Sequence, residues 1–160
     1  MLVREANAGD LDSMLALECE AGTAAHWSRQ SYAAIFQPDA VPRKALVLHK
    51  DGTLLGFVVA LAAGPEWEIE NIVVHGTARK QGVGTSLIGE LLQRARIAGA
   101  EAVCLEVRES NAAARALYEK NGFFSNGLRS SYYSEPTENA VLYRYCFAAA
   151  QQPFKPVDFR

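Results

Sequence analysis

The residues Arg79-Lys80-Gln81-Gly82-Val83-Gly84 have the composition of an anion-binding loop. They follow an apolar run that ends in Ile72-Val73-Val74, and they precede an amphipathic run with helical spacing. A strand that leads through such a loop into a helix places free backbone N–H groups and the positive end of the helix dipole at one point. Glycine lets these amides approach phosphate oxygens closely, and the two basic residues add charge. The loop therefore predicts a diphosphate site.

Two common nucleotide motifs do not fit this loop. It lacks the Lys-Ser/Thr ending of a Walker P-loop. A dinucleotide fingerprint would need three glycines near the first strand of a βαβ unit, which this chain does not offer. The loop is therefore not predicted to be a Walker P-loop or a dinucleotide-binding loop.

Glu106 is a carboxylate within the otherwise apolar segment 101–108. Strand alternation places Val103, Leu105 and Val107 on one face, with Cys104, Glu106 and Arg108 on the other. The structural interpretation of Glu106 is an ion pair with Arg108 or a strand-end charge that reaches water, because buried carboxylates need partners.

Tyr118 gives Glu106 a second, functional interpretation. It lies on the predicted helix that follows, and a strand-loop-helix return brings its hydroxyl toward the same cleft. A carboxylate in a partly apolar site gains basicity, so Glu106 could accept a proton from an ammonium with a pKa of about 7.7–8.0, directly or through water. Tyr118, with an ordinary pKa near 10, could donate to a departing thiolate. Core packing of its ring is the alternative.

The elements that position these groups follow from periodicity and turn signals. Asp10 precedes a helical pattern, Lys50-Asp51-Gly52-Thr53 is a hairpin signal, and Gly99 and Gly122 end helices. We predict strands over 2–6, 44–49, 54–62, 66–74, 101–108, 123–133 and 140–147, and helices after Asp10, after Ser28, from Val83 and from Asn111. The order β-α-α-β-β-β-α-β-α-β-β indicates a mixed α/β fold.

Length and composition limit the possibilities. With 160 residues, of which 49% are hydrophobic, the chain is predicted to form one domain over residues 1–147, followed by an irregular tail, 148–160, that contains two prolines. The tail either packs on the surface or reaches a partner.

A net charge of -2 argues against a dedicated nucleic-acid binder. No apolar run approaches the roughly 18 residues of a membrane span, so we expect a soluble, cytoplasmic protein.

The three cysteines, Cys19, Cys104 and Cys146, are odd in number and far apart. This spacing matches neither a disulfide framework nor a zinc site, and we expect reduced, mostly buried thiols. The histidines His26, His49 and His75 are scattered, and we expect them at the surface or in loops.

The segment from about Glu66 to Tyr145 resembles the GNAT acyltransferase superfamily. Within it, the segment is similar to the RimI-type N-terminal alanine acetyltransferases, which modify a small-subunit ribosomal protein. The residues that carry the resemblance are Asn71-Ile72-Val73-Val74, Arg79 to Gly84, Leu105-Glu106-Val107-Arg108-Glu109-Ser110-Asn111, Ala116-Leu117-Tyr118-Glu119-Lys120-Asn121-Gly122-Phe123 and Arg129-Ser130-Ser131-Tyr132-Tyr133.

The resemblance implies a fold, a donor and roles. The implied GNAT fold is a single domain whose mixed, mostly antiparallel sheet of about six to seven strands is splayed at the acetyl-CoA site and flanked by about four helices. It implies Glu106 as general base, Tyr118 as general acid, direct attack in a ternary complex, and no metal. A backbone N–H near Val73 or Val74 could steady the thioester oxyanion. The implied acetyl-CoA contacts are the strand residues Ile72, Val73 and Val74, the loop residues Arg79, Lys80, Gln81, Gly82, Val83, Gly84 and Thr85, and Asn111, which can also cap its helix.

On the acceptor side, Trp27 and the pair Tyr132-Tyr133 resemble loops that flank the peptide site in this family, although core packing also suits Trp27. Glu66, Glu68 and Glu70 recur at alternate positions. Their strand face could attract a basic peptide, with Glu70 among its contacts, or it could simply be solvated. Relatives commonly carry a second arginine beside Arg129, and the tail after Phe147 is longer than usual; both departures bear on the acceptor.

Three hypotheses for the activity follow. The first is an N-acetyltransferase for a protein N-terminus, most simply an N-terminal alanine of a ribosomal protein, acting as a monomer or weak dimer without direct contact to nucleic acid or membrane. The second is acetylation of a small amine; a lysine side chain is a poorer acceptor because its pKa is near 10.4. The third is a non-catalytic acetyl-CoA-binding module. A Cys104 acyl-enzyme is disfavoured because no histidine lies near it in sequence.

Overall fold

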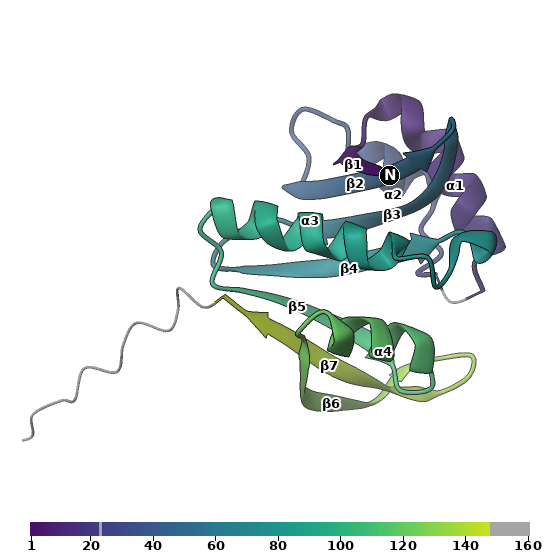
Figure 1. The fold of residues 1–160 in the computed structure, drawn as a ribbon. Helices are drawn as coiled ribbons and strands as arrows, with labels where there is room; N and C mark the ends of the chain where they lie inside the picture. Colours follow the sequence, from purple (N-terminus) through teal and green to yellow (C-terminus); the bar gives the residue numbers. More distant parts are fainter. Residues whose placement is uncertain (23, 148–160) are drawn as a thin grey trace, which may run out of the picture.

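The computed structural model describes residues 1–22 and 24–147 (Figure 1). The predicted order of strands and helices is confirmed, and most boundaries lie within two residues of the expectation. The predicted tail, 148–160, lies outside the described residues. The strands and helices are β1 (Leu2–Glu5), α1 (Leu11–Glu20), α2 (Arg29–Ala34), β2 (Arg43–Lys50), β3 (Thr53–Leu61), β4 (Glu66–Val74), α3 (Val83–Ile97), β5 (Ala102–Arg108), α4 (Ala112–Lys120), β6 (Phe124–Tyr133) and β7 (Glu138–Cys146).

The seven strands form one sheet in the order β1-β2-β3-β4-β5-β7-β6. Only the central pair, β4 and β5, is parallel, so the sheet is mixed and mostly antiparallel as expected. The β2–β3 hairpin turns through Asp51 and Gly52, both of which have positive φ. This geometry matches the right-handed twist of the strands and explains why Asp-Gly is a hairpin signal.

Helices cover the two faces of the sheet unequally. Helices α3 and α4 lie on one face, where Leu87, Leu91 and Tyr118 are part of the larger apolar core (Figure 1). Helices α1 and α2 cover the other face, where Met14 and Tyr32 are part of a second core. This second core contains no residue from β5, β6 or β7. The outer half of that face therefore presents its side chains without a covering helix among the described residues.

Strands β4 and β5 separate part-way along their length. They pair from Glu66 opposite Ala102 to Ile69 opposite Leu105, and beyond this point the ladder stops. A β-bulge lies at the same place on the other side of β4, because Val59 pairs with Asn71 while Ala60 pairs with Ile69. Glu70 is thus the extra residue. A bulge bends its strand and reverses which side chains face each side of the sheet, and this bulge leaves the second half of β4 free along the edge that faced β5.

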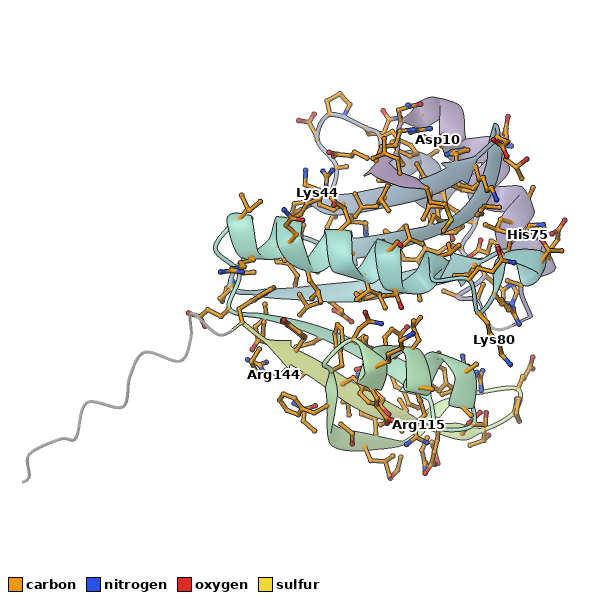
Figure 2. All side chains as sticks on the ribbon, in the orientation of Figure 1. Asp10, Lys44, His75, Lys80, Arg115 and Arg144 are labelled. Carbon is orange, nitrogen blue, oxygen red and sulfur yellow. The ribbon has the colours of Figure 1, made fainter. Side chains whose placement is uncertain are left out.

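Helices α3 and α4 pack closely at the end of the molecule where the strands separate. A Cβ added to Gly84 would lie 2.8 Å from Leu117 Cδ2, so glycine permits this contact. Helix α4 is held to β7 through Tyr143, whose hydroxyl accepts from Arg115 Nε at 3.1 Å and donates to Glu119 Oε1 at 2.7 Å. Figure 2 labels Arg115 on this helix. The contacts fix α4, and with it Tyr118.

Two sequence-based expectations are wrong. Asp10 stands before α1 but makes no side-chain cap there; its carboxylate instead binds the N–H of Asn7 and the guanidinium of Arg4. The three cysteines are free as expected, yet Cys19 and Cys146 are exposed and Cys104 is half-buried. Cys104 and Cys146 are incompletely buried because they lie on the face of β5 and β7 that α1 and α2 do not reach.

Candidate active site

The free edge of β4 offers backbone hydrogen-bonding groups. His75 N–H donates to Leu55 O at 2.7 Å, so this residue points toward β3. Because backbone groups alternate in direction along a strand, Val73 also points toward β3, whereas Ile72 and Val74 point to the side that β5 has left. Of the three predicted residues, Ile72 and Val74 therefore have amide groups available to a ligand lying in the gap, and Val73 does not.

The predicted anion loop leads directly into α3. Gly82 is the N-cap residue, with φ of 82°, and no side chain within residues 1–22 and 24–147 caps the helix. The first-turn N–H groups of Val83, Gly84 and Thr85 therefore have no side-chain acceptor, as an anion site requires. Gln81 does not reach into this turn, because its Nε2 donates to Thr77 O at 2.8 Å.

Positive charge accompanies these amides. Arg79 and Lys80 are exposed, and neither forms an ion pair with any residue in 1–22 or 24–147. Lys80 extends from the loop at the N-terminal end of α3 (Figure 2). Thr85 lies beside α4, where its hydroxyl accepts from Asn121 Nδ2 at 3.4 Å. The loop combines unpaired amides with unpaired cations and is fixed against α4.

Glu106 lies on the uncovered face of β5, and the Glu106 side chain is 19% exposed. Its partner is Arg129 of β6, whose Nη1 donates to Glu106 Oε1 at 2.6 Å. The expected partner, Arg108, instead binds Glu138 and stacks on Tyr133 at 4.4 Å. Arg108 is unavailable to Glu106 because the β6–β7 turn, which the local sequence does not place, lies against it.

The two predicted tyrosines at the end of β6 lie around this carboxylate. Hydrogen bonding and charge from Glu106 raise the pKa of Tyr132, which is exposed and also stacks on Arg129 at 4.3 Å. Burial and the charge of Glu106 raise the pKa of Tyr133. The two rings meet edge-to-face with centroids 5.0 Å apart. Both remain protonated near neutral pH and line the approach to Glu106.

Tyr118 lies on the opposite face of the sheet. Its ring is 4% exposed and packs on Phe123 and Tyr143, at centroid distances of 5.8 and 6.0 Å. Its hydroxyl makes no hydrogen bond to the described part of the chain. Burial, with a smaller contribution from Tyr133, raises the Tyr118 pKa well above its usual value. The ring therefore packs in the core, and its hydroxyl stays protonated near neutral pH.

Glu106 and Tyr118 come from opposite faces of one sheet, and the missing β4–β5 pairing explains how both could serve one site. Beyond Ile69 and Leu105 no backbone ladder separates the two faces. Tyr133, which interacts electrostatically with Glu106 and with Tyr118, lies near both. The arrangement allows a donor to approach from the α3–α4 side and an acceptor from the Glu106 side.

The predicted acidic face of β4 exists, but most of its charge is paired. Glu70 accepts from Arg43 at 2.6 and 3.1 Å, and Glu66 pairs with Arg144. Glu68 has no ion-pair partner among the described residues. Desolvation and then the charges of Glu106 and Glu70 raise the pKa of its carboxyl.

The remaining predicted residues have structural roles. Trp27 is half-buried, stacks on Tyr32 at 5.3 Å and lies under Arg43 at 5.3 Å, so it packs on the second core and also borders the open face. Asn111 caps α4 by accepting from Ala114 N–H at 3.2 Å, as expected. Sequence reasoning missed Arg43 as a neighbour of the site, because only the pairing of β2 with β3 and of β3 with β4 brings it to Glu70.

Cys104 does not have the environment of a nucleophile. Burial raises the pKa of its thiol, although nearby Arg144 opposes the shift, and Arg144 Nη1 donates to its sulfur at 3.5 Å. A protonated thiol is a poor nucleophile. In the described part of the chain, no group of three potential metal ligands occurs, and no helix is long and apolar enough to cross a membrane.

Residues 11–123 match the model of the acetyltransferase (GNAT) family. The chain belongs to this family. It is 37% identical to the [ribosomal protein bS18]-alanine N-acetyltransferase of Haemophilus influenzae over 100 aligned residues. The alignment covers 61% of this chain and 68% of that protein. A Bacillus subtilis relative is 30% identical over 142 residues, covering 88% and 91% of the two chains. The structure of the Escherichia coli ribosomal-protein-S18-alanine N-acetyltransferase superposes with a TM-score of 0.79 at 27% identity, over 91% and 92% of the chains.

The GNAT fold and an N-acetyltransferase activity are thereby established for this chain. Enzymes of the GNAT family use acetyl-CoA as the acetyl donor.

Proposed function

We propose that this GNAT enzyme transfers acetyl from acetyl-CoA to the α-amine of a protein N-terminus, with the N-terminal alanine of a small-subunit ribosomal protein as the preferred acceptor. The observation that carries the proposal is that a carboxylate, Glu106 on the open face, and a tyrosine, Tyr118 on the α3–α4 face, lie on the two sides of the sheet region where β4 and β5 separate. The bS18-alanine N-acetyltransferase activity named for the relatives supports the choice of acceptor.

The residues at the gap fit acetyl-CoA. The uncapped first turn of α3 with Arg79 and Lys80 suits the pyrophosphate, and the free backbone groups of Ile72 and Val74 suit the amide-bearing pantetheine arm. When bound, acetyl-CoA supplies an acetyl group on a thioester. We assign Asn111 and the loop residues up to Thr85 as further contacts of the same molecule.

In this proposal Glu106 accepts the proton that the acceptor must lose. An N-terminal ammonium has a pKa of about 7.7–8.0, so a substantial fraction is protonated at neutral pH, and the nitrogen attacks only as the free amine. Arg129 fixes the orientation of the Glu106 carboxylate. Glu106 passes the ammonium proton to solvent. The nitrogen then bonds to the acetyl carbon as the carbon–sulfur bond breaks, and the second N–H proton passes to the regenerated Glu106 carboxylate, directly or through water.

The departing thiolate needs a proton, and we assign its donation to Tyr118. The raised pKa keeps this tyrosine protonated throughout the neutral range. Because the pKa of a thiol, near 8.5, lies below that of Tyr118, the tyrosinate that the donation leaves is reprotonated from solvent. The oxyanion that develops on the acetyl group would be met by a backbone N–H on the free edge of β4, where Val74 rather than Val73 points into the gap.

The acceptor would lie over the open face of the sheet. Trp27, Tyr132 and Tyr133 offer flat apolar surface, and Glu68, which has no ion-pair partner among the described residues, adds a carboxylate beside them. Aromatic rings beside carboxylates suit a short peptide that carries a positive charge at its first residue.

The test is acetyl transfer to a panel of acceptors, followed as free-thiol release. The panel contains an alanine-starting peptide from a bS18 protein, the same peptide with a blocked N-terminus, and small amines. The proposal predicts turnover on the unblocked peptide and little on the others. Turnover on small amines alone would overturn the acceptor assignment, and binding of acetyl-CoA without any turnover would support a non-catalytic module.

A further inference from the structure

Glu18 is a buried carboxylate for which the proposed chemistry has no use. It lies in α1, is 2% exposed, and has no cationic partner among the described residues. Its Oε1 accepts from Trp27 N–H at 2.9 Å and from Asn71 Nδ2 at 3.1 Å. A buried carboxylate held only by neutral donors is costly, so its place in the fold needs a reason.

Asn71 connects this carboxylate to the strand that forms the gap. Asn71 is 6% exposed and is the first residue of β4 after the Glu70 bulge. Its Nδ2 also donates to Tyr32 OH at 2.7 Å, and its Oδ1 accepts from Ala25 N–H at 3.5 Å. Glu18, Tyr32 and Asn71 thus tie α1, α2 and the segment 24–28 to the point where β4 leaves β5.

The same network positions Trp27 and Arg43, which border the proposed acceptor site. Glu18 holds the backbone of Trp27, whose ring lies between Tyr32 and Arg43. Arg43 in turn binds Glu70 through both oxygens. Displacement of the Trp27 backbone would therefore move an aromatic surface that packs against the Arg43–Glu70 pair beside the open face, without touching the anion loop at α3.

We propose that Glu18 is a positioning residue for the acceptor. Through Trp27 N–H and Asn71 it holds segment 24–28 over the open half of β4. The inference rests on the proposed function, because it assumes that the acceptor binds on this face. It predicts a selective loss of acceptor affinity when these two hydrogen bonds are removed, with unchanged binding of the donor.

The test compares Glu18→Leu, which removes both hydrogen bonds, with Glu18→Gln, whose carbonyl oxygen can still accept them. Asp12→Asn is the control on the same helix, since Asp12 is exposed and, among the described residues, pairs only with Arg29. With the alanine-starting peptide, Glu18→Leu should raise KM about tenfold, the effect of one to two lost hydrogen bonds, with kcat within about threefold. Glu18→Gln should lie within about threefold of wild type in KM, and CoA affinity by titration should not change.

A purely structural role predicts a lower melting temperature with an unchanged KM for the folded protein, and that result would overturn the proposal. If Glu18→Leu does not fold, Asn71→Ala removes one of the two hydrogen bonds to Glu18. This variant should raise KM about two- to fivefold, and an unchanged KM would contradict the inference.

Hydrogen exchange at the Trp27 and Ala25 amides provides a readout that does not depend on the peptide. Should the wild type acetylate only small amines, the proposed function fails, and KM is measured with such an amine instead. Faster exchange in Glu18→Leu together with a raised amine KM would support the positioning role. Unchanged exchange would contradict it.

Discussion

The Glu106→Gln variant tests the proposed proton acceptor with little disturbance of the fold. The substitution keeps the size of the side chain and replaces one carboxylate oxygen by an amide that cannot accept the proton of an ammonium. Arg129, the ion-pair partner, is 52% exposed and can turn to water when the charge is lost. Exposed pairs of this kind contribute about 0–1 kcal/mol, so the free energy of unfolding should change by no more than that.

The expected loss of activity is much larger. A positioned general base contributes about 10²- to 10⁴-fold to a rate, equivalent to roughly 2.7–5.5 kcal/mol of transition-state stabilisation. We therefore expect kcat to fall by at least about 100-fold, with unchanged affinity for acetyl-CoA, whose proposed contacts lie on the loop at α3 and on the free edge of β4.

The assay combines steady-state thiol release with a CoA titration and thermal unfolding of the same preparations. Glu90→Gln is a suitable control, because Glu90 also pairs with an arginine, Arg94, but lies on α3 away from the open face. A Glu106→Gln enzyme that keeps more than about one third of the wild-type kcat, while Glu90→Gln is unaffected, would refute the assignment of Glu106 as the base.

Three further outcomes are expected. Tyr118→Phe keeps the ring packing and removes a hydroxyl that has no described partner, so it should lower kcat about 10- to 100-fold with little change in melting temperature; an unchanged kcat would remove Tyr118 from the mechanism. The double variant Arg79→Gln/Lys80→Gln should weaken CoA binding about three- to tenfold at low salt, and the difference should shrink as salt is added, whereas a difference independent of salt would contradict the electrostatic role. Hydrogen bonds from Arg4 lower the pKa of Asp10, so this carboxylate stabilises the fold above about pH 4 and the contribution is lost as the pH falls through the lowered pKa. Asp10→Asn should therefore cost about 1–3 kcal/mol in urea unfolding at pH 7 and much less at pH 3, and an equal cost at both pH values would contradict this account.

Local sequence signals predicted the helices and strands well at positions where the backbone conformation itself favours a residue type. Asp51 and Gly52 both have positive φ in the hairpin, and Gly82 has positive φ before α3. The bounds of β4, Glu66 to Val74, were predicted from the preceding Gly-Pro pair and the apolar run. The loop pattern did not predict a second role of Gly84, which is to allow close contact with Leu117 of α4.

Partners that depend on long-range pairing were not predictable in the same way. The Glu106 partner is Arg129, 23 residues away, which only the β5-β7-β6 order brings close. The bulge at Glu70 reverses the facing of Asn71 and Val73, so simple alternation along β4 fails beyond it. The Glu18–Asn71 contact joins residues 53 positions apart, and a glutamate in an amphipathic helix gives no signal of burial.

The most direct test of the central claim is to locate the acetyl group. The purified protein is mixed with acetyl-CoA and an alanine-starting bS18 peptide that also contains a lysine, and the product is sequenced by tandem mass spectrometry. The account predicts a single acetyl group on the α-nitrogen of the first residue. An acetyl group on the lysine side chain, or an unmodified peptide under conditions in which a small amine is acetylated, would contradict it.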